Sequence, residues 1–464
     1  MSNRRGSVIV VVIWAVAIAA VLVAATQIVT FRQAVLGREA LARVEARWAA
    51  RAGLEQMISI MEYYHEYPNV DDPMAVVRDM ESYASGETES GSWDIRHYND
   101  GVEWAGPRDE AAKLNINRAN KAQLLTLDHM TPDVVDAIFD WKDSNNEVEG
   151  LGAERDYYDN RAAGYHPRNA NFRSFAELEL VAGAWPEYAR GEDWNLNGRL
   201  DPNEDDGSRT PPDDKPDGKL DAGWSQYLTA SSKQSKFSLS GQERLRLQSA
   251  TLEDLINRTG VDEAQAKALQ QFGRQSNVRV ENLLVTPLSQ VSGGTSGQQS
   301  QQGSSKGSSN QNRGSTSGRS SAGSSGSAGN SSTVKDLTPQ QLRAVLRETT
   351  TEDYSQPMPG RINLNTASAP LLKEILNIDS RLADAIISRR KAKQEGITSL
   401  ADLAGISGMN NATLAALAQQ FDVTSSVYTV NSRGRSRSTG AEVEIEAVVD
   451  RSELPARILS YREQ

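Results

Sequence analysis

The chain has 464 residues, a formal net charge of −11 at pH 7 and no cysteine. This length suits roughly three domains. The acidic balance argues against a nucleic-acid-binding protein, because such domains are usually basic. The absence of cysteine excludes disulfides, thiolate zinc sites and a cysteine nucleophile, and the four histidines fall in no HExxH-like spacing.

An uncharged apolar stretch over residues 8–25 dominates the N-terminus. As an α-helix it would span ~27 Å, about the thickness of a bilayer core. Arg4 and Arg5 precede it, and basic residues on this short side predict a cytoplasmic N-terminus and a translocated remainder. From Phe31 to Met61 apolar residues recur at three to four positions among charged ones, so one long helix should continue beyond the membrane.

This segment admits three interpretations: a cleaved signal peptide, a plain signal anchor and a pilin-type leader. A signal peptide would be cut at a small-x-small site such as the one before Thr26. However, the apolar run is long for a signal peptide, and the amphipathic continuation is hard to explain if the segment is removed.

A helical-hairpin unit is repeated along the chain. Residues 114–143 align with residues 362–391, and residues 245–272 form a weaker copy. Each copy has a polar turn, an apolar helix, a short link and a second helix, which predicts duplicated small helical domains. Residues 292–333 are almost wholly Ser, Gly, Gln and Asn and cannot bury enough apolar surface to order themselves, so we predict a flexible insertion.

Strand patterns flank the helical units. Residues 91–106 predict a β-hairpin. Trp93, Ile95 and His97 alternate with Asp94 and Arg96, and an Asn-Asp-Gly turn follows before the chain returns. Residues 426–433 and 441–450 predict two more strands around a Gly- and Ser-rich turn. In the last strand apolar residues alternate with glutamates, which is typical of a half-buried antiparallel strand.

Residues 193–204 fit the twelve-residue EF-hand loop that binds calcium. Gly198 at position 6 permits the sharp turn, and Leu200 fills the apolar position 8. The predicted ligands are the side chains of Asp193, Asn195, Asn197, Asp201 and Glu204 and the carbonyl of Arg199. Calcium needs six to eight hard oxygen ligands, and this spacing wraps them round one point. The alternative interpretation is a solvated acidic loop.

Two further acidic groups are weaker candidates. Residues 213–224 are a degenerate copy of the loop in which Lys215 stands where a ligand belongs, so binding of a second ion is left open. The candidate ligands of this copy are Asp213, Asp217 and Asp221. A third cluster comprises Asp140, Asp143, Glu147, Glu154 and Asp156. Because no nucleophile or histidine accompanies it, metal binding or a solvated surface is favoured over acid–base catalysis, and we predict no catalytic residue.

The helical hairpins also suggest a different function, that of a membrane-anchored DNA-binding protein. Helix-hairpin-helix modules hold phosphate through backbone N–H groups of a glycine-rich hairpin at a helix N-terminus. The links here, residues 128–132 and 377–380, contain no glycine. The basic residues within 389–393 are equally explained by a solvated helix face. Nucleic-acid binding is therefore not expected.

The N-terminus resembles that of the general secretion pathway protein K family, the large minor pseudopilins of type II secretion systems. Arg4, Arg5 and Gly6 before Ser7 look like a prepilin peptidase site. Val11 stands where most pilins carry Glu and where K-type members lack it. Ser7 departs from the family, which usually has a bulky apolar residue after the cleavage site.

Three internal segments carry the same resemblance. LNINRANKAQLL (114–125) resembles the family's LNxNxAxxxxL segment, and RINLNTASAPLL (361–372) with the terminal strands resembles its second helical module and closing sheet. DWKDSNNEVEGLGAERDYY (140–158) is similar to the family's tryptophan-acidic stretch, the most specific of these features. The EF-like loops, the third hairpin copy and the Ser/Gly tract look like additions to the family pattern.

The resemblance implies an α+β, pilin-like fold. A long N-terminal α-helix should pack on a small antiparallel sheet, with a large, mostly helical domain of helix-hairpin-helix or SAM-like repeats inserted. The resemblance also implies cleavage after Gly6 by prepilin peptidase, methylation of the new N-terminus at Ser7, and assembly at the pseudopilus tip. The partners would be the I- and J-type minor pseudopilins and the major pseudopilin.

The same resemblance implies a non-enzymatic, structural role in protein secretion across the outer membrane. The protein would be a single-pass inner-membrane protein with a cytoplasmic N-terminus and a periplasmic bulk, stabilised by Ca²⁺. The expected segments are a leader (1–6), a transmembrane and amphipathic helix (7–61), a first part of the pseudopilin domain (62–112), an inserted helical domain (113–290) with calcium loops at 190–224, a disordered Ser/Gly-rich insertion (291–333), a second helical module (334–423) and the closing strands (424–464).

Overall fold

The computed structural model describes residues 5–99, 101–161, 163–292 and 334–464. The first four residues of the predicted leader and nearly all of the predicted Ser/Gly insertion lie outside the described residues. The chain divides into two compact units. Unit 1 comprises residues 1–243, 354–409 and 417–464, and unit 2 comprises residues 244–353 and 410–416.

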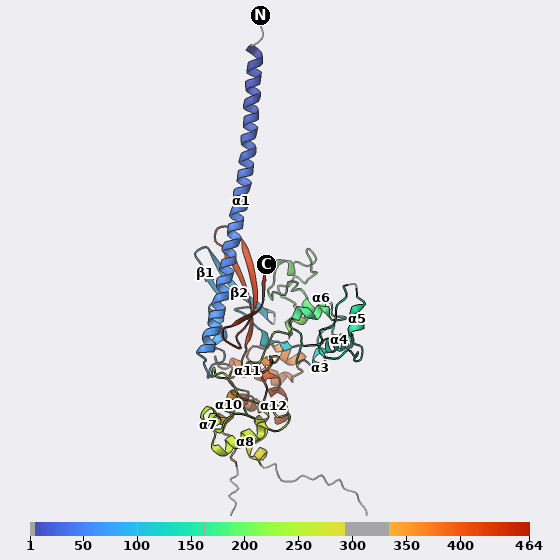
Figure 1. Cartoon of the computed structure of the whole chain (residues 1–464), viewed down its shortest axis with the longest axis vertical. Coiled ribbons are helices and arrows are strands. Elements are labelled where there is room, and N and C mark those ends of the chain that lie inside the picture. Colours follow the sequence, from blue (N-terminus) through green and yellow to red (C-terminus); the bar gives the residue numbers. More distant parts are fainter. Residues whose placement is uncertain (1–4, 100, 162, 293–333) are drawn as a thin grey trace, which may run out of the picture. The chain divides into compact units, whose positions relative to one another are not determined.

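One helix, α1 (Arg5–Glu66), forms the N-terminal part of unit 1 (Figure 1). Its first part is long and apolar enough to cross a membrane, and the side chains of residues 8–41 are all exposed. From Ala42 onward one face is buried, by residues spaced three and four apart. The predicted long helix is therefore confirmed, and it ends at Glu66 rather than near Met61.

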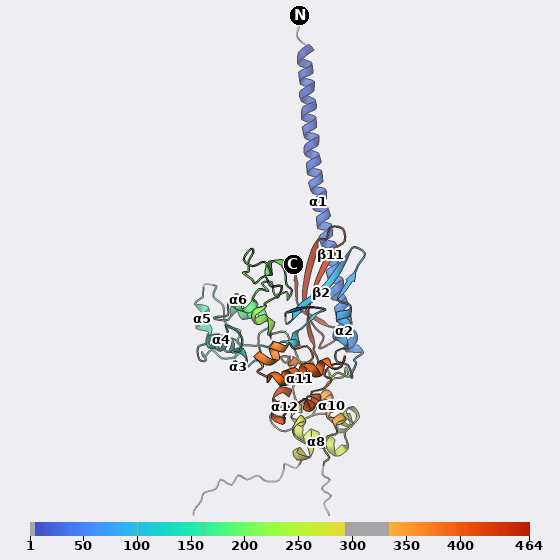
Figure 2. The ribbon, with the colours of Figure 1, turned by 180° about the vertical axis from the view of Figure 1, so that it is seen from behind.

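An antiparallel sheet packs against this buried face of α1. Its strand order is β1-β2-β11-β12-β13, with β3 paired to β2 and β4 paired to β11. The strands are β1 (Ser85–Glu87), β2 (Gly91–Asn99), β3 (Val102–Ala105), β4 (Arg108–Asp109), β11 (Val427–Ser436), β12 (Glu442–Asp450) and β13 (Arg457–Glu463). The predicted hairpin and the two predicted terminal strands are present, whereas β13 was not predicted as a separate strand. Figure 2 shows β2 and β11 side by side, although they lie far apart in the sequence.

The core between α1 and the sheet is apolar and close-packed. Leu54 and Met57 of α1 are fully buried against Val430 of β11 and Ile445 of β12. A Cβ at Gly434 would lie 2.0 Å from the Ala46 carbonyl oxygen, so the helix reaches the strand only because this residue is glycine. Burial of this kind stabilises the contact between helix and sheet by about 25 cal/mol per Å² of apolar area.

Helical modules enter the chain between β4 and β11. Each of the three predicted repeats begins with a two-residue strand that pairs in parallel with a later one. The pairs are β5 (Leu114–Asn115) with β6 (Leu228–Thr229), β7 (Leu245–Arg246) with β8 (Thr349–Thr350), and β9 (Ile362–Asn363) with β10 (Phe421–Asp422). The fold is therefore α+β, with a long N-terminal helix on an antiparallel sheet and mostly helical insertions.

Short helices make up these modules. Those of unit 1 are α3 (Lys121–Leu124), α4 (Pro132–Lys142), α5 (Arg155–Asp159), α6 (Pro186–Arg190) and α11 (Ser380–Lys391). Those of unit 2 are α7 (Leu252–Thr259), α8 (Glu263–Gly273), α9 (Leu288–Ser292) and α10 (Pro339–Glu348), and α12 (Asn411–Ala418) begins in unit 2. A further short helix, α2 (Ala75–Ser82), lies outside the modules, between α1 and β1.

Candidate metal centre

Among the described residues, a compact group of acidic side chains lies at the C-terminal end of α4. The helix begins with Pro132 at its first turn and buries Ile138 and Trp141. Asp140 lies on this buried side and is fully buried itself. Asp143 follows the last helical residue, and the loop after it returns the chain so that Glu154 stands at the N-terminal boundary of α5.

Three carboxylates meet at this point. Single oxygen atoms of Asp140, Asp143 and Glu154 all lie within 4.8 Å of one another. The Oδ2 atom of Asp140 and both carboxylate oxygens of Glu154 are buried and have no hydrogen-bond partner among the described residues. Burial raises the pKa of Asp140 and of Glu154, and the neighbouring carboxylates raise both further. Buried carboxylates without donors are costly, and a hard divalent cation is the partner that such an oxygen set fits.

The loop closes tightly over these oxygens. The backbone N–H of Glu149 donates to Asp140 Oδ1 at 3.1 Å, and that of Leu151 donates to Asp136 Oδ2 at 3.0 Å. A Cβ on Gly152 would lie 2.1 Å from Asp140 Oδ2. Glycine is therefore needed at this position to leave room for the carboxylate.

An aromatic cluster supports the same region. Trp141 contacts the rings of Tyr158, Tyr165 and Phe172, with centroid distances of 5.3, 6.2 and 6.4 Å. Tyr158 is fully buried, and its hydroxyl accepts a hydrogen bond from the Ala182 N–H at 3.1 Å. These contacts hold α4 and α5 together, and with them Asp140 and Glu154.

The cluster thus gathers three of the five predicted residues. Glu147 and Asp156 are exposed and do not belong to the group of three. Binding of an ion by the cluster stays a prediction.

The EF-like loop over residues 193–204 also folds back on itself. Leu196 and Gly198, at positions 4 and 6, have φ angles of 57° and 68°, and glycine adopts this conformation without strain. Asp193 at position 1 accepts a hydrogen bond from the Gly198 N–H at 3.0 Å. Glu204 at position 12 accepts from the N–H groups of Trp194 and Asp201, both at 3.1 Å.

The acidic side chains of this loop are buried. Asp193 and Glu204 are 1% and 0% exposed, and Asp193 Oδ1 has no hydrogen-bond partner among the described residues. Burial raises the pKa of Glu204 to about 8, and the charges of Asp193 and Asp201 contribute to the rise. Asp201 Oδ2 instead accepts hydrogen bonds from the side-chain amides of Asn195 and Asn197, at 3.0 and 2.8 Å.

The sequence analysis missed the cations near this loop. A cavity of about 370 Å³ lies next to Asp193 and is lined also by Arg108 and Lys113. Burial raises the pKa of Asp193, whereas the charges of Arg108 and Lys113 lower it. Burial, together with the charge of Arg108, lowers the pKa of Lys113 to about 7. Both cations come from the segment after β3, whose sequence shows no motif that would reveal them.

The degenerate loop over residues 213–224 is different. Asp213, Asp217 and Asp221 are exposed. Asp217 and Asp221 each accept a hydrogen bond from a backbone N–H two residues later, at 3.0 and 3.1 Å. Among the described residues, these three carboxylates are not gathered into a group with metal-ligand spacing.

Comparison with known proteins matches two segments of the chain. Residues 105–190, which include α4, α5 and the carboxylate cluster, match the family model "Type II secretion system (T2SS), protein K". The resemblance to protein K is confirmed over this segment. Residues 360–422 match the model "Helix-hairpin-helix motif". No curated protein matches the chain.

A solved structure is also similar to this chain. It is a chain of "The Crystal Structure of the GspK-GspI-GspJ complex from enterotoxigenic Escherichia coli Type 2 Secretion System". The alignment covers 92% of this chain and 99% of that one, with 11% sequence identity and a TM-score of 0.41. At this level of similarity it carries no argument about function.

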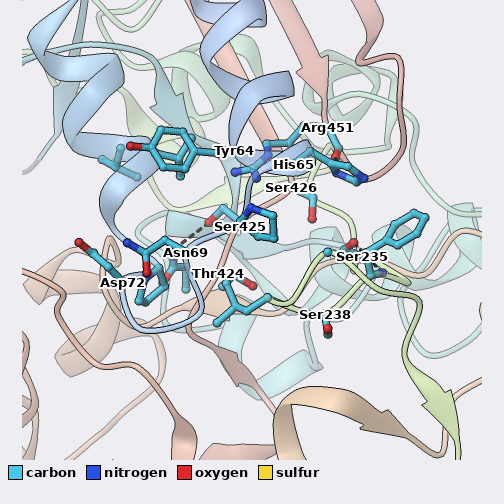
Figure 3. A pocket seen from close by; sticks show the side chains of 18 of the residues that line it. Tyr64, His65, Asn69, Asp72, Ser235, Ser238, Thr424, Ser425, Ser426 and Arg451 are labelled. Carbon is cyan, nitrogen blue, oxygen red and sulfur yellow. Dashed lines mark hydrogen bonds between the residues drawn. The ribbon is translucent and has the colours of Figure 1, made fainter. Parts of the chain in front are cut away.

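A small pocket near the end of α1 brings serine and histidine side chains together (Figure 3). The pocket measures about 70 Å³ and is lined by His65, Ser425 and Ser426, among others. His65 Nδ1 donates a hydrogen bond to the Arg451 carbonyl oxygen at 3.0 Å. Among the described residues, no hydrogen bond joins His65 to Ser425 or Ser426, so the pocket lacks the pairing of base and nucleophile that hydrolysis by serine requires.

Proposed function

We propose that this chain is a minor pseudopilin of a type II secretion system, with a structural role in protein secretion across the outer membrane. The observation that carries the proposal is the match of residues 105–190 to protein K. The matched segment begins at the edge of an antiparallel sheet, and this sheet packs on the second half of a long N-terminal helix whose first half is exposed and apolar.

In this proposal α1 anchors the protein in the inner membrane, with the N-terminus in the cytoplasm and the bulk in the periplasm. Prepilin peptidase removes the leader after Gly6, and the new N-terminus at Ser7 is methylated. The basic residues before the apolar stretch support this orientation.

We place the protein at the tip of the pseudopilus, with I- and J-type minor pseudopilins as neighbours and the major pseudopilin below. Val11 supplies no carboxylate to pair with the N-terminal amine of a subunit stacked above. A bulky insertion between β4 and β11 would also block such stacking. Replacing Val11 by Glu tests which of the two features sets the tip position. If assembly is unchanged, the bulky insertion and not the missing carboxylate determines it.

Calcium would act here as a structural ion. Asp140, Asp143 and Glu154, whose oxygens lie within 4.8 Å of one another, would hold one ion. The oxygens of residues 193–204 would hold another next to the unpartnered Oδ1 atom of Asp193, although among the described residues Asp193, Asp201 and Glu204 are not gathered into a group of that kind. In both places the ion would compensate a buried carboxylate oxygen that has no hydrogen-bond partner among the described residues.

The decisive experiment is the N-terminal mass of the full chain expressed in membranes with and without a prepilin peptidase. The proposal expects a mature chain that begins at Ser7 only when the peptidase is present. A chain that keeps Met1 in both cases would be a plain signal anchor, and a start near Thr26 would mean a cleaved signal peptide. Either result would overturn the assembly proposal.

The helix-hairpin-helix match over residues 360–422 favours DNA binding as a second candidate. The local geometry argues against it. The Asp379 carboxylate accepts hydrogen bonds from the N–H groups of Arg381 and Leu382, at 3.0 and 3.2 Å, so a phosphate would meet a negative charge at this helix N-terminus. Arg390 donates to the carbonyl oxygens of Leu364 and Ala367 and is thus engaged within the fold. DNA affinity that falls steeply with salt would support this second candidate.

A further inference from the structure

The EF-like loop contacts the pilin sheet through the same residues that form its predicted ion site. Its backbone pairs with the end of β2, where the Tyr98 N–H donates to the Gly198 carbonyl oxygen at 2.7 Å. The Asn431 side chain of β11 donates to the Asn197 carbonyl oxygen at 2.9 Å and is buried. Loop positions 5 and 6 are therefore attached to two neighbouring strands.

Two ion pairs extend this contact. Arg199, whose side chain is 5% exposed, donates to Asp94 of β2 at 2.8 Å. Arg433 of β11 donates to Asp201 at 2.7 Å and to Glu444 of β12 at 2.8 Å. Partly buried, charge-assisted hydrogen bonds of this kind are stronger than exposed ion pairs. Loop positions 7 and 9 are thus also fixed to the sheet.

An independent observation points to a cation inside the loop. Asp193 is 1% exposed, and its Oδ1 atom has no hydrogen-bond partner among the described residues. Its other oxygen accepts the Gly198 N–H, so the free oxygen belongs to the same turn that touches the sheet. An ion bound to Asp193 and Glu204 would hold this turn in one conformation.

We propose that loop 193–204 is a calcium-dependent latch that fastens the inserted domain to strands β2 and β11 of the pilin sheet. The proposal rests on calcium binding by this loop, as given under the proposed function. With calcium bound, the carbonyls of Asn197 and Gly198 and the side chains of Arg199 and Asp201 face the sheet together. Without calcium, the Oδ1 atom of Asp193 is buried without a partner, and the loop opens away from the strands so that water can reach it.

Calcium binding and the contact with the sheet are coupled, and the coupling free energy is the same in both directions. If calcium strengthens the sheet contact, the sheet contact must strengthen calcium binding. Asn431 is neutral and is no predicted ligand, so its removal leaves the net charge near the ion unchanged. It removes the bond to the Asn197 carbonyl and also a hydrogen bond to Glu444 Oε1 at 2.7 Å. Asn431→Ala should therefore weaken calcium binding by the loop about tenfold. Ser432→Ala is the matched control, because its hydroxyl is buried in the same strand and has no hydrogen-bond partner among the described residues.

The test uses the full chain in detergent micelles, with CaCl₂ or EGTA and with Mg²⁺ as the control ion. Hydrogen exchange is followed in peptides that contain Tyr98. We expect exchange there to speed up at least tenfold when calcium is chelated. The calcium effect should disappear in Asp193→Asn and Glu204→Gln and persist in Asp140→Asn, which alters only the other candidate site. Asp193→Asn and Glu204→Gln each keep the shape of the original side chain. If one of these variants misfolds, the other still tests whether calcium acts through the loop.

Calorimetry of the same variants separates the two ways of failing. If Asp193→Asn binds as many calcium ions as the unmodified chain, the loop holds no ion and the calcium proposal fails together with the latch. If the loop loses one ion but Tyr98 exchange never responds to chelation, calcium binding stands and the latch is wrong. Unchanged calcium affinity in Asn431→Ala would contradict the latch in the same way.

Discussion

The cluster of Asp140, Asp143 and Glu154 and the loop over residues 193–204 are two candidate cation sites that are built in different ways. The loop follows a regular spacing, and both Glu204 oxygens already accept backbone N–H groups. The cluster follows no regular spacing, but Glu154 has no donor for either oxygen among the described residues. A regular ligand spacing in the sequence therefore does not indicate how many buried carboxylate oxygens are left without a hydrogen-bond donor.

The physical difference is where the compensating interactions come from. In the loop, backbone N–H groups and the nearby cations Arg108, Lys113 and Arg433 offset part of the negative charge. In the cluster, the charges that raise the pKa of Asp140 and of Glu154 are other carboxylates, which add to the cost of burial, and Lys121 is the cation whose charge acts on Asp140. We therefore expect calcium to stabilise the fold more through the cluster than through the loop.

The largest effect should follow from the double variant Asp140→Asn, Glu154→Gln. An ion at a hundred times its dissociation constant stabilises a fold by about 2.7 kcal/mol, and the variant should lose this contribution from the cluster. In EGTA the variant should be more stable than the unmodified chain, because it no longer buries uncompensated carboxylates. Thermal unfolding of the full chain measures both effects: the variant should unfold at a lower temperature than the unmodified chain in calcium and at a higher temperature in EGTA. An equal calcium-dependent shift in both proteins would show that the cluster holds no ion.

Gly152→Ala should have the next largest effect. The added Cβ would lie 2.1 Å from Asp140 Oδ2, so the carboxylate or the loop must move. We expect a loss of roughly 1–3 kcal/mol in stability, as for other overpacked sites, together with weaker calcium binding. Gly405→Ala is the control, because no atom lies within 4 Å of a Cβ at that position. Urea unfolding compares the two variants, and similar losses in both would refute the argument from close contact.

The sequence alone predicted the parts of the fold that depend on local pattern. The long helix follows from hydrophobic periodicity, and the hairpin of β2 and β3 follows from alternation and its turn. The three repeats each start with a short strand as their alignment suggests. β13 escaped prediction because Arg457, Ile458 and Leu459 at its start are all exposed and show no alternation between buried and exposed positions.

The candidate sites were predicted less completely, for a physical reason. The EF-like spacing predicted a set of ligands in one loop, but the partners of that loop, Asn431 and Arg433, lie more than 200 residues away. In the cluster, sequence proximity suggested five carboxylates, while the turn after α4 brings only three together. Such contacts depend on how strands and loops meet in space, which no local pattern records.

A smaller effect should appear in the pH dependence of the calcium-free protein. Folding raises the pKa of Glu204 from 4.5 to about 8. The contribution of this group to stability is therefore fully present below about pH 4.5 and is lost as the pH rises through about 8. Glu204→Gln cannot titrate, so in EGTA its free energy of unfolding should rise steadily relative to that of the unmodified chain between pH 5 and pH 8. Urea unfolding at pH 5, 6.5 and 8 measures this, and parallel pH profiles would rule out burial of an ionisable group at Glu204.

The smallest effect is expected in the degenerate loop. Asp217 and Asp221 are exposed, and each accepts a hydrogen bond from a backbone N–H of its own turn. Asparagine can accept the same bonds, so Asp217→Asn and Asp221→Asn should each change stability by less than ~0.5 kcal/mol. The number of calcium ions bound per chain, measured by calorimetry, should also stay the same. Loss of one ion in either variant would mean that exposed carboxylates in a regular loop can hold calcium here without burial, and that spacing rather than unpaired buried oxygens decides where the ion binds.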